Sequence, residues 1–207
     1  MRKTTRGLSI VAGLLVLAAC GSSDLPKVSA PGSTLDAEDY AVMKATLRDV
    51  VSADSESTQR GRTTTNPIVL FKSTVPVCDR ASMPTRNVGL PGCVDRAWLD
   101  QLSRLAGPSA HSVTASFERR NSRALPIRGD LGDVTFVPES VDRGYQLNDF
   151  VRQSSFPRAI VAFSAPAYPA AGAAVVAYRY FWHGLGFVLL RRSGTEWRVD
   201  KTSDIVE

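Results

Sequence analysis

The N-terminal half of the chain alternates between polar segments and stretches in which apolar residues recur every three or four positions. The first such stretch predicts a helix with this apolar stripe: Tyr40, Met43, Leu47 and Val50. Ser33 or Thr34 can cap its start, because a hydroxyl oxygen can accept a hydrogen bond from a backbone N–H of the first turn. The polar segment 53–66 is expected to form a loop, and 68–71 a short strand.

Two more helices are predicted further along. Asp95 can cap the second, which is expected to end at Gly107. Its apolar stripe consists of Trp98, Leu99, Leu102 and Leu105. A third, shorter helix over 109–121 is predicted from Val113 and Phe117, which lie one turn apart.

The C-terminal part of the chain changes to β-prone runs separated by short turns. These runs are 159–163, 173–182, 186–190 and 196–199. Because connections this short join antiparallel neighbours, the runs predict a meander. Helices early and strands late predict an α+β fold, in which a C-terminal antiparallel β-meander has the N-terminal helices packed on one face.

Three aromatic residues alternate along one of these runs. Tyr178, Tyr180 and Trp182 would share a face of their strand. Such a strip can stack on glycans, but the helices that carry Met43 and Trp98 are available to cover it. We therefore expect it to belong to the core.

The first twenty residues resemble the signal peptide of a bacterial lipoprotein. A basic start precedes the apolar run 8–19, whose twelve helical residues would span about 18 Å, short of a bilayer core of about 30 Å. The run ends in Leu17-Ala18-Ala19-Cys20, which resembles a lipobox. An ordinary secretory peptide with a chance cysteine, or a buried N-terminal helix, are the alternatives.

The lipoprotein resemblance implies both an anchor and a location. Cys20 would carry two or three acyl chains, enough for stable attachment to a membrane. Residue 21 is Gly, whereas Asp after the lipidated cysteine resembles an inner-membrane retention signal, so the periplasmic face of the outer membrane is favoured. We expect residues 1–19 to be a signal peptide, 20–33 the lipidated cysteine and a flexible tether rich in Gly, Ser and Pro, and 34–207 a single α+β domain.

The charge of the chain is less basic than its total indicates. The formal net charge is +5. Residues 1–19 contain Arg2, Lys3 and Arg6 and no acid, so the remaining 188 residues hold 22 Lys and Arg against 20 Asp and Glu, a net charge of +2. A balance this even does not favour nucleic acid as a partner.

Three cysteines are present, and the lipobox accounts for Cys20. Cys78 and Cys93 then form an even pair around a segment rich in turn-forming residues. Redox chemistry favours a C-x-x-C spacing, which is absent, and a metal site needs more ligands than two thiols. We therefore expect a structural disulfide between Cys78 and Cys93.

Candidate chemistry is sparse elsewhere. His111 and His183 lie in no metal-ligand spacing, and there is no nucleophile elbow or phosphate-binding loop. Asp130 and Asp133 flank Gly132 and are expected to form a solvated turn rather than a calcium loop. We predict no catalytic residue, no metal site and no cofactor.

Arginine is the dominant cation, and several arginines cluster. The clusters are Arg119, Arg120, Arg123 and Arg128 in one segment, and Arg191-Arg192 at the end of a β-prone run. Guanidinium groups suit phosphate or carboxylate partners, such as an anionic envelope polymer. A solvated surface explains the same residues without a ligand.

The C-terminal segment also resembles a diffuse group of uncharacterised secreted bacterial proteins. The matching pieces are Phe117 to Asn121 with Leu125, Phe156-Pro157, Phe163 to Tyr168, Ala173 to Gly186, and Gly194 to Val199. The glycine turn of that group often carries cysteines, which the turn from His183 to Gly186 lacks. The resemblance implies an exported α+β domain and no particular activity.

These observations predict an envelope lipoprotein whose domain has a binding or structural role and does not catalyse a reaction. The expected partners are the membrane, reached through lipidated Cys20, and an envelope protein or anionic envelope polymer. One alternative is a hydrolase of envelope polymers that uses Ser164, or an acid pair such as Glu118 and Asp142. The other is a periplasmic binder of small molecules, with its pocket between helices and sheet.

Overall fold

The computed structural model describes residues 34–51, 67–79, 92–141, 144–153, 157–181 and 184–203. Its helical elements are α1 (Ala37–Thr46), the π-helical turn Leu47–Val51, the 3-10 turns Arg96–Trp98 and Gly107–Ser109, α3 (Leu99–Ala106), α4 (Ala110–Arg120) and α5 (Gly144–Gln153). Its strands are β1 (Ile68–Leu70), β2 (Val77–Cys78), β3 (Val94–Asp95), β4 (Val134–Phe136), β5 (Ala159–Phe163), β6 (Ala167–Ala170), β7 (Ala173–Tyr180), β8 (Gly184–Ser193) and β9 (Glu196–Thr202).

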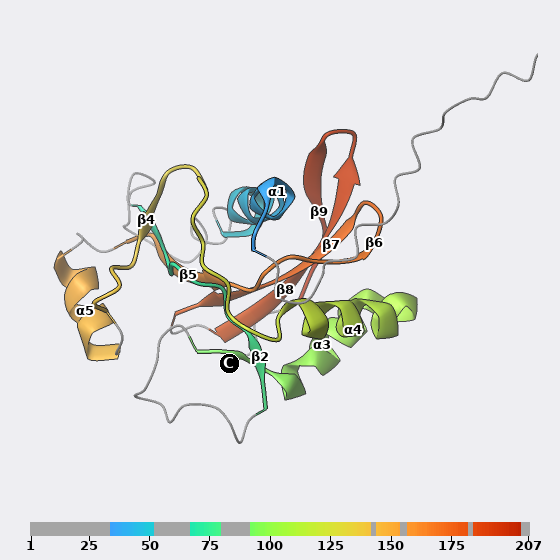
Figure 1. The fold of residues 1–207 in the computed structure, drawn as a ribbon, viewed down its shortest axis with the longest axis horizontal. Helices are drawn as coiled ribbons and strands as arrows, with labels where there is room; N and C mark the ends of the chain where they lie inside the picture. The colour runs from blue at the N-terminus through green and yellow to red at the C-terminus, as the bar shows by residue number, and fades with distance from the viewer. Residues whose placement is uncertain are drawn as a thin grey trace, which may run out of the picture.

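A mixed sheet of seven strands forms the centre of the fold (Figure 1). Its order is β4-β1-β5-β7-β8-β9, and β6 pairs with the first part of β7. β1 runs parallel to both β4 and β5, whereas the pairs β5–β7, β6–β7, β7–β8 and β8–β9 are antiparallel. The α+β class and the C-terminal antiparallel meander are therefore confirmed.

The hairpin between β8 and β9 shows why the sequence folds this way. Ser193 pairs with Glu196, so only Gly194 and Thr195 turn the chain. Gly194 has φ +63°, a left-handed conformation that a residue without a Cβ adopts without strain. As predicted, the strand that contains Trp197 lies antiparallel to the run 186–190.

The helices begin and end close to the predicted residues, with one correction at the first cap. Asp36 caps α1, where its carboxylate accepts from the N–H groups of Glu38 and Asp39, while the Asp39 carboxylate accepts from the N–H of Asp36. Two reciprocal bonds of this kind form a capping box, which Ser33 or Thr34 would not form with this spacing. Asp95 caps the second helical segment as predicted, at 3.0 Å from the N–H of Ala97.

The helices divide between the two faces of the sheet, which corrects the expectation of a single covered face. α1 and the π-helical turn cover one face, where Met43 and Leu47 pack with Tyr178 and Tyr180. Leu102 in α3 belongs to the second cluster, on the other face, to which α4 and α5 also contribute. Figure 1 shows α1 above the sheet and α3 and α4 below it.

The sequence of β7 explains this arrangement. Val176 faces the α1 side and Val175 the α3 side, and both are fully buried. A strand that is apolar on both faces needs cover on both faces. Tyr178 and Tyr180 lie in the core as predicted, whereas Trp182 lies outside the described residues. In the part of the chain that the structure describes, none of the helices has the length and apolar character needed to cross a bilayer.

Candidate functional site

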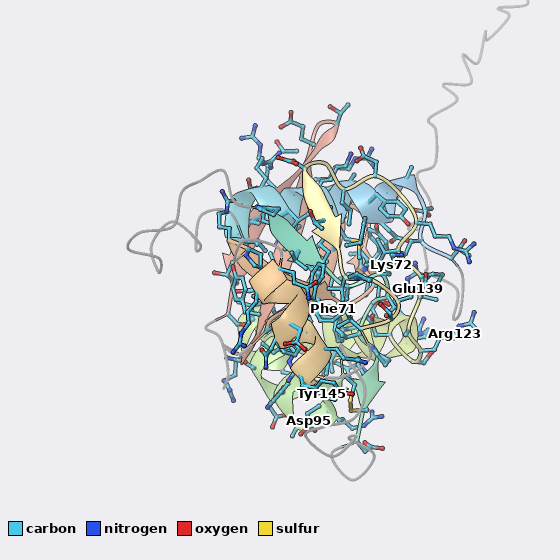
Figure 2. All side chains as sticks on the ribbon, turned by 90° about the vertical axis from the view of Figure 1, so that its left-hand side faces the viewer. Phe71, Lys72, Asp95, Arg123, Glu139 and Tyr145 are labelled. Atoms are coloured by element: carbon cyan, nitrogen blue, oxygen red, sulfur yellow. A yellow bond between two sulfur atoms is a disulfide. The ribbon has the colours of Figure 1, made fainter. Side chains whose placement is uncertain are left out.

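The cysteine pair lies where the sequence predicts it. The Cα atoms of Cys78 and Cys93 are 5.9 Å apart and their sulfur atoms are at bonding distance. The pair links the end of β2 to the residue before β3, and these strands pair in parallel with Cys78 opposite Asp95. Figure 2 shows the sulfur bond close to Asp95. The pair therefore clamps the strand that leads into α3.

Ser164 is placed as a structural residue rather than a nucleophile. Its side chain is 0% exposed, its hydroxyl accepts from the N–H of Ala177 at 2.8 Å, and it donates to the carbonyl of Ala165 at 3.3 Å. A hydroxyl engaged in this way, with no access for a substrate, cannot attack a carbonyl carbon.

The acid pair of the hydrolase alternative is not assembled in the described residues. Glu118 forms an ion pair with Arg96, and Asp142 lies outside the described residues. His111 is exposed on α4, and His183 also lies outside. Within the described ranges, no group of three or more His, Cys, Asp or Glu side chains is placed to hold a metal ion.

Asp130 forms the solvated turn that the sequence predicts. It lies 2.9 Å from the ammonium of Lys44 and accepts from the N–H of Gly132 at 2.8 Å. The hydrogen bond from Lys44 lowers the pKa of the Asp130 carboxyl. Both side chains are largely exposed, so this pair contributes little to stability.

The predicted arginine cluster is divided between surface and interior. Arg119, Arg123 and Arg128 are exposed, whereas Arg120 is 3% exposed and lies 2.7 Å from the Asp39 carboxylate. The second cluster is also ion-paired, since Arg191 pairs with Asp200 at 2.8 Å and Arg192 with Glu38 at 3.3 Å. The two clusters therefore form no single cationic surface.

Asp39 is the centre of a buried polar network that joins helices from opposite faces of the sheet. Besides Arg120 on α4, the hydroxyl of Tyr168 on β6 donates to its carboxylate at 2.9 Å. Arg120 also donates to the carbonyl of Pro166, at 3.3 Å. Burial raises the pKa of Asp39, and burial together with the Asp39 charge raises the pKa of Tyr168 far above its usual value. The network fixes α1 to α4 around the edge of the sheet.

Asn121 brings together two segments that carry the resemblance to secreted proteins. Its side chain accepts from the N–H of Ala165 at 2.7 Å and donates to the carbonyl of Ala165 at 3.0 Å. The Asn121 side chain thus forms, with the backbone between β5 and β6, the two hydrogen bonds that a neighbouring strand would form. These residues therefore have a structural role.

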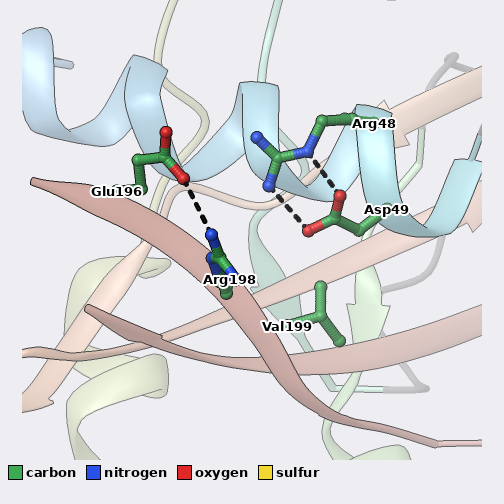
Figure 3. Close-up of a pocket in the computed structure, with 5 residues that line it drawn as sticks. All are labelled: Arg48, Asp49, Glu196, Arg198 and Val199. Atoms are coloured by element: carbon green, nitrogen blue, oxygen red, sulfur yellow. Dashed lines mark hydrogen bonds and ion pairs between the residues drawn. The ribbon is translucent and has the colours of Figure 1, made fainter. Parts of the chain in front are cut away.

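The candidate binding site is an open hollow of about 540 Å³ between the π-helical turn and β9 (Figure 3). It is lined by Arg48, Asp49, Glu196, Arg198 and Val199. Arg48 and Asp49 form a two-pronged ion pair, with Nη2 2.8 Å from Oδ2. Arg198 pairs with Glu196 across 3.4 Å on the strand itself. The hollow is therefore charged, with both signs present.

The ion pair at this site also holds the backbone of β9. Arg48 Nη2 donates to the carbonyl of Trp197 at 3.2 Å, and the Asp49 carboxylate accepts from the N–H of Val199. The hydrogen bond from Arg48 lowers the pKa of Asp49 and raises that of Arg48. Arg48 thus supplies a hydrogen-bond donor, and Asp49 an acceptor, to the side of β9 that faces away from β8.

The sequence gives little signal for this site. Arg48 and Asp49 are ordinary surface residues in a helical pattern, and Arg48 and Trp197 are 149 positions apart in the sequence. The π-helical turn that carries them is a conformation often found at functional positions, but no residue pattern in 47–51 predicts it.

Comparison with protein-family models, curated proteins and solved structures gives no match for this chain.

Proposed function

We propose that this chain is a lipid-anchored protein of the bacterial cell envelope whose domain binds a partner and does not catalyse a reaction. The observation that carries the anchor is the order Leu17-Ala18-Ala19-Cys20 behind a basic start and an apolar run of twelve residues. In a lipobox, small residues fit the cleavage site and the cysteine supplies the thiol to which diacylglycerol is attached. Two or three acyl chains on Cys20 give stable attachment where one chain is marginal.

Two observations support the compartment. Disulfides persist in oxidising environments, and Cys78 and Cys93 lie at disulfide distance. Gly21, in the position where Asp resembles an inner-membrane signal, favours the periplasmic face of the outer membrane.

Two further observations favour binding over the alternatives. Ser164 and Glu118, the described candidates of the hydrolase alternative, are engaged in structural contacts. The hollow beside β9 is open and lined by charged side chains, whereas small-molecule sites are mostly enclosed and apolar. An open, charged hollow of this kind suits an extended or polymeric partner better than a small ligand.

Metabolic labelling with radioactive palmitate tests the anchor. The wild-type chain is expected to incorporate label and to partition into detergent, and Cys20→Ser to do neither. Gly21→Ala, which leaves the cysteine in place, is the matched control and is expected to keep the label. A wild-type chain that takes up no label overturns the proposed anchor.

A further inference from the structure

Exposed arginines of one sign begin at the end of α4 and continue along the segment that leads to β4. Residues 119–128 hold four arginines and no acid. Arg120 is buried against Asp39. The other three arginines are exposed: Arg119, Arg123 and Arg128. Within the described residues, neither Arg119 nor Arg128 forms an ion pair with an acid.

A backbone hydrogen bond fixes this segment beside the residues that follow β1. The N–H of Ile127 donates to the carbonyl of Lys72 at 2.7 Å. Ile127 is buried in the core, whereas the next residue, Arg128, is exposed. Lys72 adds an exposed ammonium, which lies 3.5 Å from the Glu139 carboxylate. Figure 2 shows Lys72, Glu139 and Arg123 on the same side of the molecule. We call the three exposed arginines and Lys72 the cationic strip.

The cationic strip lies along α1, on the flank away from β9. At its start, Arg120 donates to the carbonyl of Thr34 at 3.5 Å. At its end, the N–H of Arg128 donates to the hydroxyl of Tyr40 at 2.9 Å. On the other flank, Arg48 bonds to the backbone of β9. Figure 1 shows the segment that leads to β4 and the strand β9 on either side of α1. The hollow beside β9 and the cationic strip therefore lie on opposite flanks.

The connection to the proposed anchor begins beside the start of this strip. Fourteen residues, 20–33, lead from the lipidated cysteine to Thr34. A Gly- and Ser-rich chain of this length has an average end-to-end distance of about 20 Å. The anchor therefore holds the start of the strip close to the lipid headgroups.

We propose that the cationic strip docks the domain on anionic phospholipid headgroups of the membrane in which Cys20 is anchored. Guanidinium groups bind phosphate oxygens through pairs of parallel hydrogen bonds. The arginines of the β8–β9 hairpin are less suited, because each already pairs with an acid: Arg191 with Asp200, Arg192 with Glu38 and Arg198 with Glu196. Docking through the strip leaves the hollow on the flank away from the contact, where a partner can reach it. The inference rests on the proposed lipid anchor.

Energy transfer from the domain to headgroup-labelled lipids tests this orientation. The full chain, purified from envelopes, is inserted into vesicles of phosphatidylcholine, alone or mixed with phosphatidylglycerol. A fluorophore is attached at Ala124→Cys, in the segment of the strip, or at Thr195→Cys, in the β8–β9 turn, both of which are exposed positions. With phosphatidylglycerol present, transfer is expected to be stronger from position 124 than from position 195. This difference is expected to be lost in phosphatidylcholine alone, and at about 1 M salt, where charges are screened within about 3 Å.

Charge variants test whether the strip produces the difference. In the two labelled chains, replacing Arg119, Arg123 and Arg128 with Gln is expected to abolish it. The matched control replaces three exposed arginines elsewhere with Gln and is expected to keep it: Arg104, Arg152 and Arg191. Unfolding midpoints identify a variant that has lost the fold, and the three single substitutions then take the place of the triple variant.

Two outcomes overturn the inference. They are equal transfer from the two positions in vesicles with phosphatidylglycerol, and a difference that persists in a folded chain without the three arginines.

A chain released from envelopes without an acyl group overturns the anchor and not the strip. Sedimentation of that chain with phosphatidylglycerol vesicles then decides. The wild type is expected to bind more tightly than the triple variant, by about fivefold for each arginine that reaches the surface. Equal binding of the two chains overturns the inference.

Discussion

At the scale of single residues, the buried contacts of Arg120 and Asp39 carry more consequence than the exposed charges that surround them. Both are almost fully buried, and their partners come from α1, α4, β6 and the backbone at Pro166. A buried ion pair adds little net stability compared with apolar residues of the same size, but removal of one partner leaves the other charge buried alone.

Arg120→Met is therefore expected to lower the free energy of unfolding by about 3–5 kcal/mol. The double variant Asp39→Leu with Arg120→Met is expected to lose markedly less than the sum of its two single variants, because no charge is left without a partner. Urea unfolding measures all four proteins. Arg119→Met, on the exposed side of the same helix, is the control and is expected to change stability by no more than about 0.5 kcal/mol. Strictly additive effects of the two single variants would contradict this account.

Asp49 gives the domain a defined dependence on pH. The hydrogen bond from Arg48 lowers the pKa of Asp49 below its unfolded value, so the ionised carboxylate stabilises the fold above the usual Asp range. This contribution is lost as the pH falls through the lowered pKa. The stability advantage of the wild type over Asp49→Asn is expected to be constant above about pH 5 and to vanish at lower pH, as unfolding midpoints across pH would show. An advantage that grows as the pH falls would contradict this assignment.

At the scale of elements, the second helical segment contains two residues, Trp98 and Leu102, that the sequence pattern treats alike but that differ in burial. Leu102 is fully buried against the sheet, whereas Trp98 is half-buried at the end of the 3-10 turn before α3. The stripe predicts both as core residues, but the 3-10 turn rotates Trp98 away from the line that an α-helix would follow.

Leu102→Ala is expected to lower the free energy of unfolding by about 2–5 kcal/mol, because it leaves a cavity in a closed core. Trp98→Ala is expected to cost less, despite the larger side chain, because water reaches the vacated space. Denaturant unfolding midpoints of the two variants, compared where the dependence of the unfolding free energy on denaturant is the same, show which variant is less stable. A larger effect at Trp98 would mean that its ring lies deeper than the fold indicates.

The elements that the sequence predicts are those with local signals. The meander follows from short turns and β-prone runs, and the caps and stripes of the helices follow from spacing. α5 escapes prediction because its apolar residues, Leu147, Phe150 and Val151, are few within a polar segment. The parallel pairing of β1 with β4 and β5 escapes it as well, because three apolar residues give no indication of the partners they will meet.

At the scale of the whole molecule, the division of the helices is the feature that local patterns do not determine. An apolar stripe indicates that a helix packs against other elements, but it does not determine on which face of the sheet the helix packs. The candidate site shows the same limit, because Arg48 and Asp49 become neighbours of Trp197 and Val199 only when α1 lies on the last strand. The Cys78–Cys93 pair was predictable because the argument for it rests on the number and spacing of the cysteines and needs no knowledge of the fold.

The packing of the first helix on the last strands determines the order in which this chain can fold. Met43 and Leu47 share their cluster with Tyr178 on β7, Val188 on β8 and Trp197 on β9. A chain that emerges with its N-terminus first cannot complete the surface that buries α1 until its final strands have followed. Contacts this distant in sequence close slowly, since a long loop must first be ordered. The first helix is therefore expected to gain its packing late, after the last strands of the described sheet have paired, so that the two ends of the domain stabilise each other.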